Sequence, residues 1–490
     1  MKRGRYSASL RRVQLPAKCY RGLVPPASRL LGRHGRIAID STIQHLASFA
    51  IEVTYDDLSA EVVHQVKRVL ADTMACAAGG YQGAPAMLAR QLAATTSSTT
   101  PARMLGTVGA TAPDMAAFVN TVTARYIDCN DTYAGIGGHP SDMIGAILAV
   151  ADSTKASGRD VVLAIALGYE VYCRLADVVS VGQRGFDQGA LCILGSTAAC
   201  GRLMGLTPDQ MGNALAMAAV SYLPLGVIRS GELSMWKGCA TAGANSAAVF
   251  SAQLAALGMT GPPAAFEDKS GWWRQFTGEP VALSAFGSTD GPWRIMNTSF
   301  KSYPAQIHIQ GAISLAAGLR SQVKLADIAS IHVESYRSAA HSSADPAKWL
   351  PKNRETADHS LPYLVAVALL DGTVTPASFT DARIADPAVP PILAKMTVTE
   401  NPAYTARFPQ EAITRIDVTT TAGQHLVAET THPKGHYLHP LADADIEAKF
   451  RELAAGTLTP TGCDAALAAV WGIDTAPSVT ALLDAMVVGV

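Results

Sequence analysis

Acidic side chains are missing from the first 39 of the 490 residues, which instead hold ten lysines and arginines. The rest of the chain carries 29 basic against 40 acidic residues, so it lacks the basic surface that nucleic-acid binding requires. Residues 1–36 resemble an organelle transit peptide in composition, or they form an upstream extension with no structural role. We expect this basic extension to be disordered. We place the protein in the cytoplasm, or in the mitochondrial matrix if the extension is a transit peptide.

Aromatic and charged residues are also scarce, at 6% and 16% of the chain, whereas 49% of it is hydrophobic. The shortage of rings excludes a ring-lined β-sandwich, and the many small residues favour closely packed helices. The eight cysteines form no C-x-x-C motif, which excludes a disulfide scaffold and indicates a reducing compartment. The uncharged stretches 210–228 and 238–266 contain Gln, Asn, Ser and Pro, so they indicate buried helices rather than membrane spans.

Several common motifs are absent as well. No G-x-G-x-x-G, P-loop, G-x-S-x-G or H-E-x-x-H sequence occurs, which removes the usual signatures of nucleotide binding, serine hydrolases and zinc proteases. The one close group of histidines, His432, His436 and His439, has no adjoining carboxylate or cysteine. Pro433 and Gly435 also argue against the helix that would bring the first two together. We therefore predict no metal site there.

What is present is a helical pattern from about residue 40 to 270. Strand-like runs follow at 328–336, 395–400 and 413–432, the last with the composition of a hairpin. Helical patterns lie between these runs at 356–370 and after them at 442–455 and 464–488. We predict a mainly α fold in which a helical domain, residues 37–270, is completed by residues 440–490. Residues 271–439 then form an inserted α+β domain.

A single histidine, His139, lies between His64 and His308, in the polar, glycine-rich stretch DCNDTYAGIGGHPSD. Asp128, Asp131, Thr132 and Asp142 are its neighbours in sequence. An imidazole can act as acid or base near neutral pH, and a carboxylate beside it would keep it cationic or fix its tautomer. The alternative is a loop histidine that only caps neighbouring helices, and the sequence does not decide between the two.

Two lysines stand out because their surroundings carry so little charge. Lys237 precedes 29 uncharged residues, and Lys301 lies in the polar but neutral segment NTSFKSYPAQIHIQ with Tyr303 close by. Such an ammonium either marks the surface or projects into a pocket, where it would pair with a substrate carboxylate. A third polar stretch, NRETADHSLPY, places His359 and Tyr363 four residues apart, on one face of a predicted helix.

These features together resemble the MmgE/PrpD family, which includes 2-methylcitrate dehydratases and cis-aconitate decarboxylases. The resemblance runs in family order over residues 40–455 and rests on these segments: DTMACAAGG, YIDCNDTYAGIGGHPSD, GYEVYCRL, RGFDQGA, MWKGCATAGANSAAVF, MTGP, FKSYPAQIHIQ, ADPAKWLPKNRETADHSLPYLVA and HPKGH. It implies an all-helical domain with an α+β lid, a homodimer, and a reaction without metal or organic cofactor.

The resemblance also implies roles for particular residues. It implies catalytic roles for Asp128, Thr132, His139, His359 and Tyr363. It implies substrate binding by Lys237, Lys301 and Tyr303, and at Gln188, where many family members carry a histidine instead. A chain without that histidine takes its proton from elsewhere or catalyses a different reaction.

The expected function is that of a lyase that dehydrates a small polycarboxylate such as 2-methylcitrate. In this reading Lys237 and Lys301 pair with substrate carboxylates while His139 moves a proton. Decarboxylation of cis-aconitate and epimerisation of a compound such as iminodisuccinate remain open, because the same groups serve all three reactions. The alternative that is not an enzyme is a catalytically silent binding protein.

Overall fold

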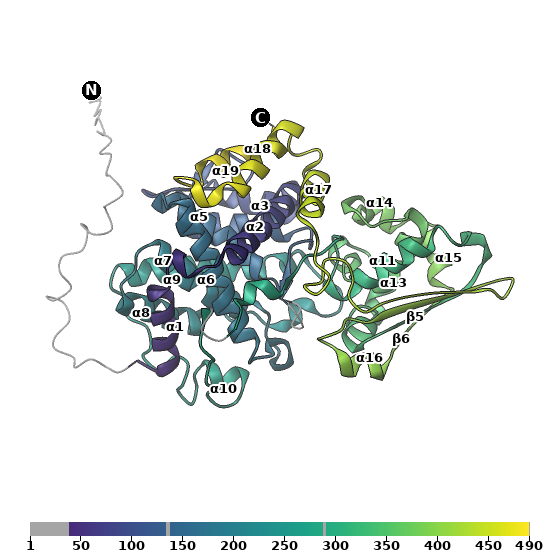
Figure 1. Cartoon of the computed structure of the whole chain (residues 1–490), viewed down its shortest axis with the longest axis horizontal. Coiled ribbons are helices and arrows are strands. Elements are labelled where there is room, and N and C mark those ends of the chain that lie inside the picture. Colours follow the sequence, from purple (N-terminus) through teal and green to yellow (C-terminus); the bar gives the residue numbers. More distant parts are fainter. Residues whose placement is uncertain (1–38, 134–137, 288–290, 490) are drawn as a thin grey trace, which may run out of the picture.

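The structure is a computed structural model that describes residues 39–133, 138–287 and 291–489 (Figure 1). The basic extension of residues 1–36 lies outside the described residues, so its expected disorder and targeting role stay predictions. The described chain is mainly helical, as the sequence predicts. Its amino-terminal part contains α1 (Ser41–Glu52), α2 (Ala60–Gly80), α3 (Ala84–Ala93), α4 (Pro113–Arg125), α5 (Ile144–Thr154), α6 (Gly158–Ala176), α7 (Gly189–Leu203), α8 (Pro208–Ser221) and α9 (Ala240–Ala256).

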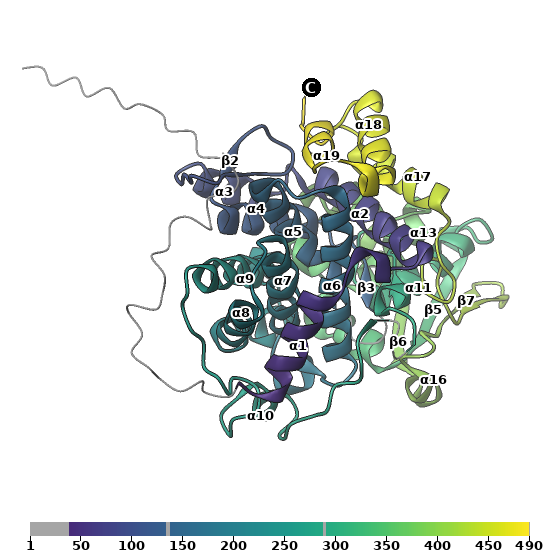
Figure 2. The same ribbon diagram turned by 60° about the vertical axis from the view of Figure 1, so that its left-hand side comes forward.

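Local sequence sets where these helices begin and how closely they pack. The Ser59 hydroxyl accepts a hydrogen bond at the start of α2, and Ser157 and Asp160 form a capping box at the start of α6. Helices α6 and α7 cross closely because glycine stands at the contact. A Cβ on Gly195 would lie only 2.7 Å from the carbonyl oxygen of Gly168. Figure 2 shows α6, α7 and α9 side by side in this helical body.

The uncharged stretches form α8 and α9, which pack against each other and against α7. In the part of the chain that the structure describes, no helix combines the length and the apolarity needed to cross a membrane. The cysteines of the described residues are buried and free, so no disulfide forms among them.

The second body is built on a four-stranded sheet with the order β6-β5-β7-β8. Strand β5 (Ile328–Ser335) pairs in parallel with β6 (Met396–Glu400) and antiparallel with β7 (Thr414–Thr420), which forms a hairpin with β8 (His425–Thr430). These are the predicted strands. Alternate residues of β5 and β7, among them Ile331 and Ile416, are buried in a second hydrophobic core with α11 (Gln310–Leu319) and α13 (Leu361–Asp371). The shorter helices of this body are α12 (Arg354–Ala357), α14 (Asp381–Ile384), α15 (Val389–Leu393) and α16 (Pro402–Arg407), whereas α10 (Trp272–Phe276) packs into the hydrophobic core of the helical body.

Three sequence predictions about elements are wrong in detail. The helix expected over 356–370 is broken: α12 ends at Ala357, and α13 starts only after Ser360, whose hydroxyl accepts from the Tyr363 amide. The helix expected over 464–488 is two helices, α18 (Pro460–Trp471) and α19 (Thr480–Ala485), because Gly472 and Pro477 interrupt it. Short strands also occur before residue 270, namely β1 (Ala102–Arg103), β2 (Ala110–Thr111) and β3 (Thr132–Tyr133). Two residues are too few to show an alternating pattern.

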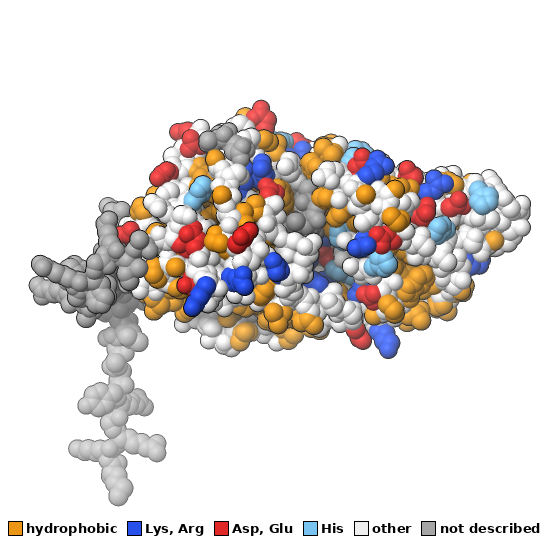
Figure 3. Space-filling model, turned by 90° about the horizontal axis from the view of Figure 1, so that it is seen from below, with side chains coloured by type: hydrophobic (Ala, Val, Ile, Leu, Met, Phe, Trp, Pro, Cys, Tyr) orange, Lys and Arg blue, Asp and Glu red, His pale blue; other side chains and the backbone are white. Residues whose placement is uncertain are grey.

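The chain returns to its first body at the end. Helix α17 (Asp443–Ala454) packs on α2, and α18 and α19 join the same hydrophobic core (Figure 1). Strand β3 pairs with β4 (Thr298–Ser299), which precedes the second body in the chain. Seen from below, the surface is hollowed between the two bodies, with charged and histidine side chains at the edge of the hollow (Figure 3). The exact domain boundaries and the role of the second body as a lid remain predictions.

Candidate active site

The site forms around the carboxylate of Asp128, which follows the end of α4. Its backbone is left-handed, with φ of +54°, a conformation that aspartate tolerates better than most residues. The Asp128 amide donates to the carbonyl of Arg125 at 3.1 Å, so the chain turns back on the helix end. This turn holds the carboxylate inside the protein, where its side chain is only 1% exposed.

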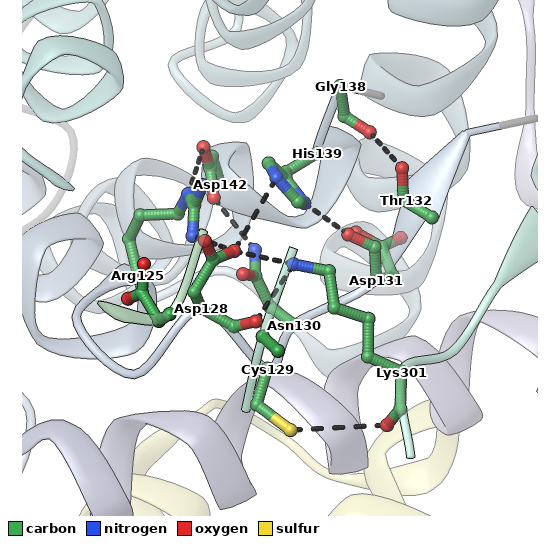
Figure 4. Close-up of polar contacts among 12 residues, drawn as sticks. Arg125, Asp128, Cys129, Asn130, Asp131, Thr132, Gly138, His139, Asp142 and Lys301 are labelled. Atoms are coloured by element: carbon green, nitrogen blue, oxygen red, sulfur yellow. Dashed lines mark hydrogen bonds and ion pairs between the residues drawn. The ribbon is translucent and has the colours of Figure 1, made fainter. Parts of the chain in front are cut away.

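Three cations surround this carboxylate. Arg125 Nη1 lies 2.6 Å and Lys301 Nζ 2.5 Å from Asp128 Oδ1, while Lys237 Nζ lies 3.3 Å from Oδ2. Burial opposes ionisation of Asp128, but Arg125 and the two lysines hold its pKa well below the usual range. Figure 4 shows Arg125, Lys301 and His139 converging on Asp128 from different elements.

Lys237 also pairs with a carboxylate from the second body. Its Nζ lies 2.8 and 2.7 Å from the two oxygens of Asp358, which sits between α12 and α13. Burial works against ionisation of Asp358 too, yet Lys237 and His359 lower the pKa of this carboxyl group. The ion pair therefore joins the two bodies in the middle of the site.

His139 stands at the start of a short 3₁₀ turn, Pro140–Met143, with its ring buried. Its Nδ1 lies 2.5 Å from the carbonyl oxygen of Asp131, so Nδ1 carries the proton and donates it. The lone pair is therefore on Nε2, which faces Asp128 Oδ1 at 3.8 Å (Figure 4). Burial, with the nearby Arg125 and Lys301, lowers the pKa of His139 well below its ordinary value. The ring is therefore not held cationic by a carboxylate, and its free lone pair on Nε2 can accept a proton.

His359 is the second imidazole on Asp128. Its Nδ1 lies 2.6 Å from Asp358 Oδ1 and 3.5 Å from Asp128 Oδ2, so this nitrogen also carries the proton. Burial and the charge of Lys237 lower the pKa of His359 to about 4. The two histidines thus differ in the partner of Nδ1, which is a backbone carbonyl for His139 and carboxylates for His359.

Gln188 and Thr132 hold the segment that carries His139. Gln188 Oε1 accepts from the His139 amide and, at 2.8 Å, from the Tyr172 hydroxyl. Its Nε2 donates to Asp142 at 3.3 Å. Thr132 Oγ1 donates to the Gly138 carbonyl at 3.0 Å (Figure 4). Both residues therefore touch the backbone around His139 and fix its position.

The two predicted tyrosines lie elsewhere. The Tyr363 hydroxyl donates to the Ser378 carbonyl at 2.6 Å within the core of the second body. It was expected beside His359 because the pattern predicted one helix through both residues, and the break at Ser360 separates them. Tyr303 lines a cavity of about 290 Å³, together with Ser314 and Lys434, and not the cluster on Asp128.

Sequence reasoning missed Arg125 and Asp358, although each stands next to a predicted residue. Arg125 precedes Asp128 by three positions at a helix end, and Asp358 directly precedes His359. It also missed His308, which lines a small cavity with Thr132 and whose Nδ1 lies 2.8 Å from the Tyr336 hydroxyl. Burial lowers the pKa of His308 to about 4, with smaller effects of His359 and Lys301.

The cations of the site argue against a bound metal ion. Asp128, Asp358 and His359 offer ligand atoms within 4.8 Å of one another, but the Lys237 ammonium already lies against both carboxylates. With Arg125 and Lys301 added, a further cation would meet strong repulsion. His432, His436 and His439 bond to backbone groups: His432 Nε2 lies 3.0 Å from the Gln410 carbonyl, His436 Nδ1 accepts from the Leu438 amide at 3.2 Å, and His439 Nδ1 lies 3.1 Å from the His432 carbonyl.

Together, these features define a mainly α protein whose buried site combines three cations with two neutral imidazoles. Models of the MmgE/PrpD N-terminal domain and the MmgE/PrpD C-terminal domain match residues 44–283 and 303–474, and the chain belongs to this family.

Among similar proteins, a 2-methylcitrate dehydratase of Cupriavidus necator is 32% identical over 63% of this chain and 66% of its own length. The chain thus matches about two thirds of that relative. A mitochondrial 2-methylcitrate dehydratase of Yarrowia lipolytica is 28% identical over 84% of this chain and 82% of its own. A human cis-aconitate decarboxylase is 26% identical over 82% and 85%, respectively.

Proposed function

We propose that this protein is a cofactor-independent lyase that dehydrates a small polycarboxylate such as 2-methylcitrate. The observation that carries the proposal is the meeting of Lys237, Lys301 and His139 on one carboxylate, Asp128. Two ammonium groups that contact the same carboxylate lie close enough to bind two carboxylates of one small molecule. The dehydratases among the similar proteins support the choice of substrate class.

The reaction begins with removal of a proton from carbon beside a carboxylate. A carboxylate is a poor electron sink, so this proton is weakly acidic, and pairing with Lys237 and Lys301 would stabilise the charge that develops. The pairing is strong because the site is buried and screened from water. His139 Nε2 carries the lone pair that would accept the proton.

Loss of hydroxide completes the dehydration. The bond from carbon to hydrogen breaks, a carbon–carbon double bond forms, and the hydroxyl group leaves as water after gaining a proton. His359 is the proposed donor, because it faces His139 across Asp128. Asp358 and His359 come from the second body and Asp128 and His139 from the first, so closure of the second body as a lid would assemble the site.

Decarboxylation of a compound such as cis-aconitate is the second candidate. One of the similar proteins is a human cis-aconitate decarboxylase, and the reaction would use the same two lysines and a protonating imidazole. The pair of imidazoles on one carboxylate also suits an epimerase, which removes and returns a proton without a leaving group.

The experiment is a substrate panel followed by NMR: citrate, 2-methylcitrate, cis-aconitate and iminodisuccinate, each incubated with the purified protein. We expect 2-methylcitrate to lose water and to give an olefinic product. Carbon dioxide release or inversion instead would assign one of the other two reactions. Binding without turnover of any compound would support a catalytically silent binding protein and contradict the proposal.

A further inference from the structure

The charges of the candidate site balance before any ligand enters. Its three cations are Arg125, Lys237 and Lys301, and its facing carboxylates are Asp128, Asp358 and Asp142, the last 3.6 Å from Arg125. All six side chains are at most 2% exposed. A dianion or trianion that enters this site therefore adds negative charge in a region of low dielectric constant. That charge is costly unless something compensates for it.

A proton is the simplest compensating charge, and two imidazoles are placed to take one at Nε2. They differ in what holds the opposite nitrogen. His139 donates from Nδ1 to the carbonyl of Asp131, which stabilises a positive ring less than a carboxylate at that nitrogen would, and the nearby Arg125 and Lys301 oppose protonation. His359 donates from Nδ1 to the carboxylate of Asp358, which stabilises an imidazolium.

The ligand itself changes the surroundings of His359. In the structure the positive charge of Lys237, 2.7 Å from Asp358, opposes protonation of the ring. A substrate carboxylate on Lys237 would neutralise that charge and bring a further negative charge close to the imidazole. Both changes favour the protonated ring.

We propose that a polycarboxylate binds this site together with one proton, which His359 takes up, while His139 stays neutral. The inference rests on the proposed function for the chemistry of the ligand. It gives the two histidines separate tasks: His359 becomes the acid that hydroxide departure requires, and His139 remains the base. The partner of Nδ1 decides these roles: a carboxylate for His359, the acid, and a backbone carbonyl for His139, the base.

Other groups near the two rings titrate or carry charge, and the test must separate them. From the elements packed around the site they are Arg125, Asp128, Asp131, Asp142, Tyr169, Lys237, Lys301, His308, Lys348 and Asp358. Asp131 is the main competitor for the proton, because burial raises the pKa of its carboxyl group to about 7. It accepts hydrogen bonds from the Tyr169 hydroxyl at 2.8 Å and the Ser141 amide at 3.1 Å.

The experiment is isothermal titration calorimetry of the full chain with tricarballylate, a tricarboxylate without a hydroxyl group to lose. At pH 7.5, the binding heat is measured in buffers of different ionisation enthalpy, and the slope gives the number of protons taken up. We expect a slope near one proton per ligand. We also expect Kd to rise with pH above 7, by about tenfold per pH unit where a full proton is taken up.

Variants assign the proton. His359→Gln should bring the slope close to zero, and Asp358→Asn should reduce it as an independent check in case the first variant folds poorly. Asp131→Asn should leave the slope near one proton per ligand, and so should His341→Gln, a matched control at an exposed histidine. Binding with zero slope in the unmodified protein, or loss of the slope only in Asp131→Asn, would overturn the inference. Absence of binding in every buffer would instead contradict the proposed ligand class.

Discussion

At the scale of single residues, Asp128 sets the arrangement of the site. Its carboxylate pairs with Arg125, Lys237 and Lys301 in a buried region where each of these side chains is at most 2% exposed. A substrate carboxylate therefore competes with Asp128 and Asp358 for ammonium groups that are already positioned. This preorganisation is what makes such groups effective in stabilising developing charge.

Replacing either lysine should remove most of the activity. Lys237→Gln and Lys301→Gln each keep a polar side chain but lose the charge that stabilises the transition state. We expect kcat/KM for the substrate found in the NMR panel to fall about 100-fold or more. Lys352→Gln is the matched control, because Lys352 is exposed in the same region as Asp358, and its kinetics should stay unchanged. Full activity in both site variants would contradict the assignment.

His139 and Gln188 should have different kinetic effects. His139→Gln removes the proton acceptor, so we expect kcat to fall about 10²- to 10⁴-fold with KM little changed. Gln188→Ala removes the contacts to the His139 amide, Tyr172 and Asp142 but no proposed reacting group, so the expected loss is closer to tenfold. Steady-state kinetics of both variants check this order, and a larger loss in Gln188→Ala would argue that Gln188 touches the substrate.

Some of these site residues can be predicted from the sequence, and others cannot. His139 stands out as the only histidine between His64 and His308, and Lys237 and Lys301 stand out because few charged residues lie near them in the sequence. Asp358 and Arg125 do not, since charged residues are common beside helix ends and only the fold shows what they face. The resemblance implies a catalytic role for Tyr363, but the helical spacing that would put it beside His359 is broken at Ser360.

At the scale of elements, the loop that carries Lys237 depends on the second body. Lys348 Nζ donates to the Gly231 carbonyl at 2.7 Å, and the Leu233 amide donates to Thr356 Oγ1 at 3.1 Å. With the pair between Lys237 and Asp358, these contacts hold residues 231–237 against the segment around α12. Any movement of the second body is thereby linked to the position of Lys237.

Loosening this loop should lower activity without removing any reacting group. Lys348→Met keeps the apolar part of the buried side chain but loses its hydrogen bond to Gly231. Since a hydrogen bond from a charged group contributes about 1.5–3 kcal/mol, we expect kcat/KM to fall roughly 10- to 100-fold. Hydrogen exchange of residues 231–237 should become faster in the variant. An unchanged exchange rate together with unchanged kinetics would show that the loop is held by other contacts.

Elements with a strong local signal are predictable from the sequence. The strands near 328–336, 395–400 and 413–432 follow from their β-branched residues, and the long helices follow from their periodic burial and caps. The pairing of β5 with β6 in parallel and β7 antiparallel is not local information. The same holds for the contact of β3 with β4, which joins segments more than 160 residues apart.

At the scale of the whole molecule, the proposed homodimer needs an apolar surface. One is offered by two neighbouring turns that expose Leu225, Val227, Met235 and Trp236, with between 47% and 70% of each residue accessible. Lys237 follows this surface directly in the chain, so a partner placed there would lie beside the site. We propose this surface as part of the dimer interface.

A charge on this surface should prevent dimer formation. Trp236→Glu places a carboxylate where the proposed interface excludes water, and we expect light scattering after gel filtration to report a monomer of 51.2 kDa. Val108→Glu, at an exposed position between β1 and β2, is the control and should leave the dimer intact. A dimer that persists in Trp236→Glu would place the interface elsewhere.

The most direct test of the account is a crystal structure of the protein with bound tricarballylate. We predict carboxylates of the ligand within hydrogen-bonding distance of the Nζ atoms of both Lys237 and Lys301, and the carbon chain beside His139 Nε2. A ligand bound elsewhere, with both lysines still paired only to Asp128 and Asp358, would contradict the account.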